Sequence, residues 1–324
     1  MGASLAPIGL HLITMSINQK EQKHYQELVK QFYPDKEAST RDSYTKSVGK
    51  VTICGKDLEF IFCKVPISLK KDKKRNPNKI PDGQSLIISR KKTIRKMTNL
   101  INTNAWEWKK KNEKRFPPVF LTLTFGSEVT DLKIANRLFS ESMQRYNYKL
   151  FKGKDKILQY VTVPEFMKNG RVHYHCLIFN LPFSFKNYDI ARDVWSNGHI
   201  KMKAAYTKSA YWLSKYMSKY MLKACDDPRF FRKRKYFPSA NLLRPIVIKD
   251  RTMAKKILEV IQRTRPQEKV RKIIVDVEFI GFVECYYCHL GENEDITDLL
   301  PELDLEIQNV LQSEIDRERE KLKL

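Results

Sequence analysis

The sequence predicts an α+β fold, an antiparallel sheet with helices packed on it. Two segments of alternating hydrophobicity are joined by an Asn169-Gly170 turn signal, which is typical of a β-hairpin. A third alternating segment precedes them, and a helical pattern follows the first strand and the hairpin. The resulting order, β-α-β-β-α, is that of a split βαβ or ferredoxin-like sheet, for which we expect helices on one face.

The elements are predicted from their periodicity and from the positions of turn residues. In chain order we expect a helix over 85–108, a strand over 119–125, a helix over 131–150, strands over 157–165 and 172–179, a loop containing Trp195 and Gly198, a helix over 209–224, a helix over 251–263 and a strand pair over 271–290. The helix over 209–224 is the clearest of these, because it contains neither proline nor glycine.

The chain ends differ in composition from this core. A helix-like stretch covers 19–33, a short strand pair lies near Val51 to Cys63, and residues 68–83 combine lysines with Pro, Asn and Gly, as an exposed basic loop would. From residue 292 onward, 11 acidic residues stand against 4 basic ones. We therefore expect a basic N-terminal region (1–84), a central domain (85–245) and a C-terminal region with an acidic tail (246–324).

The composition indicates a folded protein and favours a negatively charged partner. The 324 residues are 42% hydrophobic, too apolar for intrinsic disorder, and carry a formal net charge of +24, which attracts polyanions such as nucleic acid. The alternative is a solubility surface or a lysine-biased composition. The sequence has no apolar segment of about 20 residues and no convincing signal peptide. We expect a cytoplasmic protein without a membrane partner.

Two histidines and a glutamate form a candidate metal site. His173 and His175 are two apart in a predicted strand, so both imidazoles project from one face. Glu165 lies near the end of the preceding strand, from which the hairpin turn brings its carboxylate beside them. Two imidazoles and one carboxylate leave coordination positions open for a substrate oxygen. The alternative is a half-polar sheet face without a metal.

The helix over 209–224 carries a candidate nucleophile. Tyr216, Lys219 and Tyr220 fall on one side of it, beside an apolar stripe that can pack. A phenol is a weak nucleophile at neutral pH, and Lys219 is placed to stabilise its phenolate. A metal that polarises a phosphodiester would complement an attacking tyrosine. Alternatively, both tyrosines are edge residues of an amphipathic helix with their hydroxyls in water.

Several basic residues near these motifs are candidate contacts to nucleic acid, although each fits a solvated face as well. They are Lys215, Lys223, Arg171, Arg90 and Lys91.

Taken in order, the motifs resemble those of the HUH endonucleases, in particular the replication initiators of microviruses (gokushovirus-like phages with single-stranded DNA) and related rolling-circle plasmids. The resemblance covers roughly 85–245 and rests on FLTLTF at 120–125, Glu165 with His173-Tyr-His175, and YMSKYMLK at 216–223; Trp195 with Gly198 and the segment 236–245 add to it. The sequence lacks the cysteine-rich N-terminal segment of many gokushovirus-type relatives.

This resemblance implies an RRM-like HUH nuclease core and a site-specific DNA endonuclease that depends on Mg²⁺ or Mn²⁺. It implies nicking of one strand at a replication origin, a 5′-phosphotyrosine intermediate, a 3′-hydroxyl that primes rolling-circle synthesis, and later rejoining. Tyr216 fits the motif in both possible frames and is the expected nucleophile, with Tyr220 second. The expected partners are origin DNA, as single strand or supercoiled duplex, and a host helicase and polymerase, because no P-loop of the GxxxxGK[ST] type occurs.

Two other functions remain open. A non-enzymatic DNA-binding regulator or packaging protein would use the basic charge without chemistry, and its DNA binding would need no metal. A conjugative relaxase would share the chemistry, but its tyrosine usually comes early in the chain, whereas here the tyrosines follow the histidines.

Overall fold

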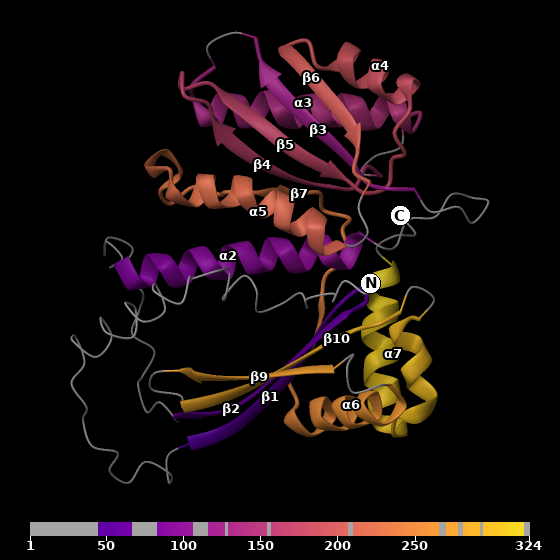
Figure 1. Cartoon of the computed structure of the whole chain (residues 1–324). Coiled ribbons are helices and arrows are strands. Elements are labelled where there is room, and N and C mark those ends of the chain that lie inside the picture. Colours follow the sequence, from indigo (N-terminus) through magenta and orange to yellow (C-terminus); the bar gives the residue numbers. More distant parts are fainter. Residues whose placement is uncertain are drawn as a thin grey trace, which may run out of the picture. The chain divides into compact units, whose positions relative to one another are not determined.

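A computed structural model describes residues 45–66, 83–105, 116–126, 129–153, 157–206, 210–265, 270–277, 281–291 and 294–320. The chain forms two compact units (Figure 1). One takes in the described residues within Met1–Pro81 and Ile246–Leu311, and the other those within Asp82–Pro245 and Gln312–Leu324. Each unit contains one antiparallel five-stranded sheet with helices packed around it, which confirms the predicted α+β class.

The sheet of the central unit has the order β6-β3-β5-β4-β7. Its strands are β3 (Val119–Phe125), β4 (Tyr160–Phe166), β5 (Val172–Ile178), β6 (Gly198–Ala204) and β7 (Phe237–Pro238). The predicted hairpin is β4–β5, and Gly170 in its turn has a φ of 85°, a left-handed conformation that glycine adopts readily. The three predicted strands of this core are confirmed, although β4 begins three residues later than expected.

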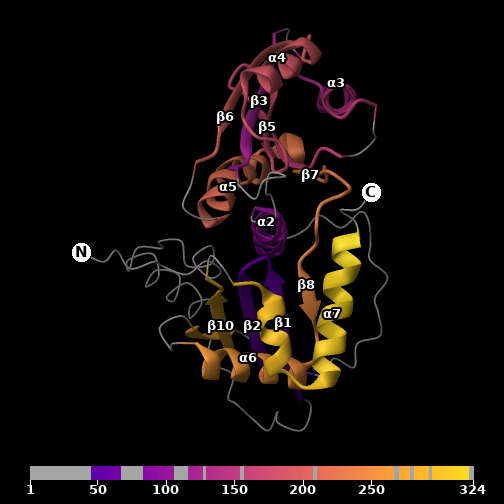
Figure 2. The same ribbon diagram turned by 90° about the vertical axis from the view of Figure 1, so that its right-hand side faces the viewer.

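Helices cover both faces of this sheet, so the expectation of helices on one face was wrong. On one face, Phe139 of α3 (Leu132–Leu150) stacks on Tyr174 with ring centroids 4.4 Å apart. On the other, Tyr216 of α5 (Ala210–Asp226) packs on Phe120, 4.6 Å between centroids. Figures 1 and 2 show α3 and α5 on opposite sides of the sheet. Double coverage explains why nearly all of β5 is buried.

The segment predicted as a loop around Trp195 and Gly198 instead contains α4 (Phe185–Val194) and the edge strand β6. Gly198 opens this strand with a φ of 152°, and a Cβ there would lie 2.2 Å from the nitrogen of Gly126. Only glycine permits this approach, which starts the pairing of β6 with β3. Glycine is common in loops, but here it marks a close backbone contact within a sheet.

Helix α2 (Gly83–Asn104) packs against α5 and matches the helix expected over 85–108. Its last residue, Asn104, is fully buried and donates hydrogen bonds from its amide to the carbonyl oxygens of Leu100 and Leu243. The backbone nitrogen of Leu243 donates in return to the Asn104 side chain. These bonds satisfy a buried amide and tie the end of α2 to the segment that follows η2 (Pro228–Phe230).

The other unit combines segments from both ends of the chain. Its sheet has the order β8-β1-β2-β10-β9, in which β2 pairs antiparallel with β10. The strands are β1 (Thr45–Cys54), β2 (Asp57–Pro66), β8 (Ile246–Ile248), β9 (Val270–Val277) and β10 (Gly281–His289). The predicted strand pairs near Val51 to Cys63 and over 271–290 are confirmed as the hairpins β1–β2 and β9–β10.

One amphipathic helix, α6 (Arg251–Thr264), packs against β1 and β2 (Figure 2). It matches the helix expected over 251–263, and Asp250 caps it by accepting a hydrogen bond from the nitrogen of Met253.

The acidic tail is folded rather than extended. Its described residues form η4 (Ile296–Glu302) and α7 (Leu305–Glu320). In α7, Ile307, Leu311 and Ile315 recur every four positions, so they share one face of the helix, and all three are buried. The helix-like stretch expected over 19–33 and the basic loop expected over 68–83 fall outside the described residues, apart from Gly83, which begins α2. None of the helices among the described residues is long and apolar enough to cross a bilayer.

Candidate active site

Strand register places the predicted metal ligands on one face of the sheet. Glu165 of β4 lies directly opposite His173 of β5, and His173 lies opposite Thr124 of β3. His175 is two residues farther along β5 and therefore shares this face. The hairpin thus brings together the three side chains that the sequence analysis selected.

Their ligand atoms converge. Oε2 of Glu165 lies 3.0 Å from Nε2 of His173 and 2.8 Å from Nε2 of His175, and the two histidine nitrogens are 3.2 Å apart. The three side chains are only 10–16% exposed. Two imidazole nitrogens and one carboxylate oxygen within 4.8 Å of one another fit a divalent cation and leave room for further ligands. We call these three residues the His-His-Glu cluster.

The cluster favours the protonation states that bind a metal. Burial raises the pKa of Glu165, but the hydrogen bonds from His173, His175 and Lys223 outweigh it and hold the pKa below its usual value. Burial lowers the pKa of His175, against the opposing effect of Glu165. An ionised carboxylate and a neutral imidazole are the forms that coordinate cations.

Helix α5 carries the tyrosines to this face. Its buried stripe contains Ala210, Leu213, Met217, Met221 and Ala224, the apolar stripe expected from the sequence. Tyr220, on the adjoining side, stacks on the ring of His175, with centroids 3.5 Å apart and planes 18° from parallel. The tyrosine helix therefore touches a member of the His-His-Glu cluster directly.

The two tyrosines are joined through their hydroxyls. The Tyr220 hydroxyl donates a hydrogen bond of 2.6 Å to the hydroxyl oxygen of Tyr216. Burial first, then the bond to Tyr216 and the charge of Glu165, raises the pKa of Tyr220, so that Tyr220 keeps its proton and acts as the donor. A donated hydrogen bond stabilises negative charge on the accepting oxygen. Tyr216, which accepts this bond, is 40% exposed.

Each of the three predicted lysines of α5 lies near an aromatic ring of the same helix. Lys223 binds Glu165, with 2.6 Å between Nζ and Oε1, and its ammonium lies 5.8 Å from the centre of the Tyr220 ring. The ammonium of Lys219 lies 5.8 Å from the centre of the Tyr216 ring. Lys215 instead contacts Trp212 and Tyr211, one turn away. Of these three predicted lysines, the structure joins Lys223 to the His-His-Glu cluster by a direct contact.

The three other predicted contacts to nucleic acid lie differently. Arg171 donates from Nη1 to the carbonyl oxygen of Phe125, 3.2 Å away, and is partly buried. Arg90 of α2 pairs with Asp226 at the end of α5, 2.6 Å away. Lys91 is exposed on α2. The structure brings none of these three into a hydrogen bond or ion pair with the His-His-Glu cluster.

Sequence reasoning missed the basic residues of β6. Register places His199, Lys201 and Lys203 opposite Thr124, Thr122 and Phe120, on the same sheet face as the His-His-Glu cluster. All three are exposed. We call them the β6 basic edge. The alternation of polar and apolar residues through 199–203 was the signal that would have identified a strand.

Part of the chain matches a known protein family. Residues 118–221 match a family model described as replication-associated protein ORF2/G2P. The matched segment contains the His-His-Glu cluster, both tyrosines and the β6 basic edge. No match was found among curated proteins or among solved structures. The match covers about a third of the chain and supports a replication-initiator family with a role in the initiation of DNA replication. Such a family is consistent with a nuclease or nicking activity.

Proposed function

We propose that this protein initiates rolling-circle replication as an HUH-type endonuclease of the kind found in microviruses and related plasmids. It binds origin DNA, nicks one strand through a covalent phosphotyrosine, and later rejoins the product. The observation that carries the proposal is the packing of a hydroxyl-linked tyrosine pair onto His175, within a cluster whose three ligand atoms fit a divalent cation.

The chain's residues divide the reaction among them. Tyr216 is the nucleophile: its oxygen bonds to phosphorus as the P–O3′ bond breaks. The 5′-phosphate of the downstream piece stays joined to the tyrosine, and the upstream piece leaves through its 3′ oxygen. The phenol proton passes to water, and the 3′ oxygen takes a proton from water to become the hydroxyl that primes synthesis. Tyr220 donates a hydrogen bond to the Tyr216 oxygen, and the nearby Lys219 ammonium favours its negative charge.

The metal centre has a separate part in this proposal. A divalent cation such as Mg²⁺ or Mn²⁺, held by Glu165, His173 and His175, would polarise the scissile phosphodiester as a Lewis acid. Lys223 holds the Glu165 carboxylate by its second oxygen while Oε2 faces the histidines. The phosphotyrosine conserves the energy of the broken bond, so a free 3′-hydroxyl can later reverse the step. Strand separation and synthesis are left to a host helicase and polymerase.

The nicking reaction is tested with labelled single-stranded oligonucleotides tiled across the replicon that encodes the protein. We expect one of them to give a protein–DNA adduct that survives denaturing electrophoresis with Mg²⁺ or Mn²⁺. EDTA should abolish the adduct, and added Mn²⁺ should restore it, because the carboxylate and imidazoles alone cannot polarise the phosphodiester. Salt-sensitive binding without any adduct would instead favour a non-enzymatic regulator or packaging protein.

We expect the β6 basic edge to bind part of the single-stranded DNA. We predict that Lys201→Glu with Lys203→Glu weakens binding of single-stranded DNA by about tenfold or more. The magnitude of the slope of log affinity against log salt should fall by about 1.4, because each lost phosphate contact to a single strand removes about 0.7. Fluorescence anisotropy at several salt concentrations measures both. The matched control is Lys133→Glu with Lys149→Glu on α3, which makes the same charge change on the opposite face of the sheet. Equal losses in both variants would show that only net charge matters.

A further inference from the structure

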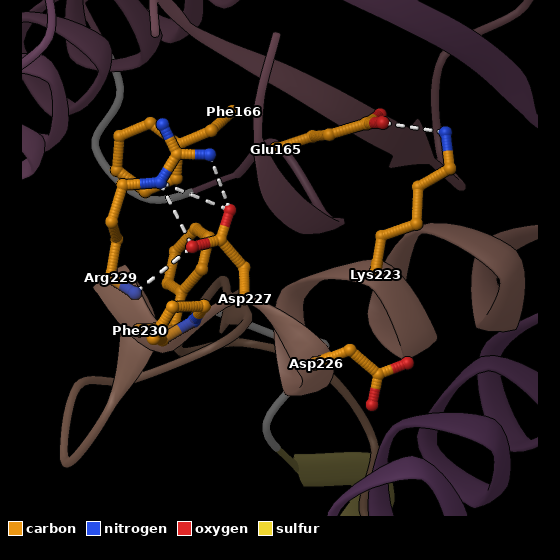
Figure 3. Close-up of a pocket in the computed structure, with 8 residues that line it drawn as sticks. Glu165, Phe166, Lys223, Asp226, Asp227, Arg229 and Phe230 are labelled. Carbon is orange, nitrogen blue, oxygen red and sulfur yellow. Dashed lines mark hydrogen bonds and ion pairs between the residues drawn. The ribbon is translucent and has the colours of Figure 1, made fainter. Parts of the chain in front are cut away.

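Beside the His-His-Glu cluster lies a cavity of about 740 Å³ that the chemistry above does not use. It is formed where the end of β4 meets the end of α5 and η2 (Figure 3). Its lining residues are Glu165, Phe166, Lys223, Asp226, Asp227, Pro228, Arg229 and Phe230. Because Glu165 and Lys223 belong to both sites, whatever enters this cavity lies next to the candidate active site.

One wall of the cavity is a guanidinium–aromatic stack that is already formed. The Arg229 guanidinium lies 3.9 Å from the centre of the Phe166 ring, which in turn lies 5.0 Å from the ring of the fully buried Phe230. Asp227 fixes the guanidinium by accepting hydrogen bonds from its Nε and Nη2 at 2.6–3.1 Å and from the backbone nitrogen of Arg229. About half of the Arg229 side chain is still exposed. The stack is therefore held in place with surface left to contact a ligand.

The carboxylates of the cavity all have cationic partners. Asp227 pairs with Arg229, Glu165 with Lys223, and Asp226 with Arg90 outside the cavity. Figure 3 shows the Asp226 side chain turned away from Arg229 and Phe166. With its charges largely compensated, the cavity offers a planar π surface more than a site for a bare phosphate. Arginine planes and aromatic rings are the surfaces on which unpaired bases stack.

We propose that this cavity receives one nucleobase of the single-stranded DNA beside the scissile phosphate, stacked on the Arg229–Phe166 pair. The inference rests on the proposed function for the identity of the strand. Stacking accepts any base, because every base has a π face, so the cavity requires a base without selecting its identity. A base held there fixes the strand relative to Tyr216, because Lys223 and Glu165 connect the cavity to the active site.

The test compares DNA with and without bases in binding assays with EDTA, which prevents cleavage. The probes are fluorescein-labelled dT12, dA12 and a 12-mer of abasic sugar phosphates. We expect the wild-type protein to prefer dT12 and dA12 over the abasic strand, and Arg229→Ala to reduce this preference by roughly 5- to 100-fold. Arg229→Lys keeps the positive charge and an ion pair to Asp227 but loses the planar guanidinium group. It should therefore also reduce the preference for strands with bases over the abasic strand. Lys133→Ala is the control for a lost surface charge.

The outcomes separate the cavity from the catalytic proposal. If both Arg229 variants bind all three strands as the wild type does, or lose affinity for the abasic strand as much as for the others, the cavity holds no base. Cross-linking of 5-iododeoxyuridine strands to Phe166, located by mass spectrometry, checks the placement without a substitution; cross-links confined to other parts of the chain would overturn it. Loss of base preference in a protein that forms no adduct would leave the cavity assignment standing and refute nicking.

Discussion

The Tyr216→Phe, Tyr220→Phe double variant is expected to lose adduct formation by at least about 10³-fold, because removing a nucleophile removes the covalent route altogether. The rings remain, so the packing on Phe120 and His175 is retained and the protein should still fold and bind DNA. Covalent product is measured by denaturing electrophoresis, and binding by anisotropy.

The single variants separate the two roles. Tyr220→Phe keeps the stack on His175 but removes the hydrogen bond to Tyr216, so we expect the rate of adduct formation to fall by about tenfold. Tyr216→Phe should lower it much further, leaving whatever attack Tyr220 supports. Tyr211→Phe is the matched control, because Tyr211 lies on the same helix but packs on its neighbour Trp212. An adduct of undiminished yield in the double variant would refute the nucleophile assignment.

The second large effect is expected at the metal centre. Replacing His175 by Ala should lower the affinity for Mn²⁺ by more than the roughly 10- to 100-fold that follows loss of an outer-shell partner, because a direct ligand is lost. Adduct formation should fall with it. Isothermal titration of Mn²⁺ into the protein measures the affinity, and Glu165→Ala should behave in the same way.

A control must show that the lost affinity is specific to this imidazole and does not follow loss of any histidine from the same sheet face. His199→Ala serves this purpose, since it removes an exposed imidazole from the same sheet face while leaving the His-His-Glu cluster intact. Its Mn²⁺ affinity should equal that of the wild type. If His175→Ala also binds Mn²⁺ as the wild type does, these three residues are not the metal site.

The core of the site was predictable because its information is local. Glu165, His173 and His175 lie on one hairpin, and the hydrophobic pattern and turn residues that predict a hairpin are close together in the sequence. The tyrosines lie on one helix with a clear apolar stripe. The sequence could not specify that Tyr220 stacks on His175 and binds the Tyr216 hydroxyl. That arrangement depends on how α5 packs across the sheet, which involves contacts between distant residues.

The errors have physical causes as well. The prediction of a loop in place of β6 is wrong because glycine is common in loops, whereas Gly198 permits close approach to Gly126 within the sheet. The Arg229–Phe166 stack joins residues 63 positions apart, which no periodicity reveals. The pairing of β2 with β10 joins segments more than 200 residues apart, as in the register of Asp57 with His289. Such pairing is set by the fold as a whole and not by either segment.

The most direct test of the central claim is to identify the residue that carries DNA in the covalent product. Trypsin cleaves after Lys215, Lys219 and Lys223, so Tyr216 and Tyr220 fall on separate peptides, 216–219 and 220–223. After nuclease treatment, mass spectrometry should find a nucleotide remnant on the peptide 216–219, with 220–223 as the second acceptor. A remnant on any other peptide, or a cut strand with no modified peptide, would contradict a tyrosine nucleophile beside the His-His-Glu cluster.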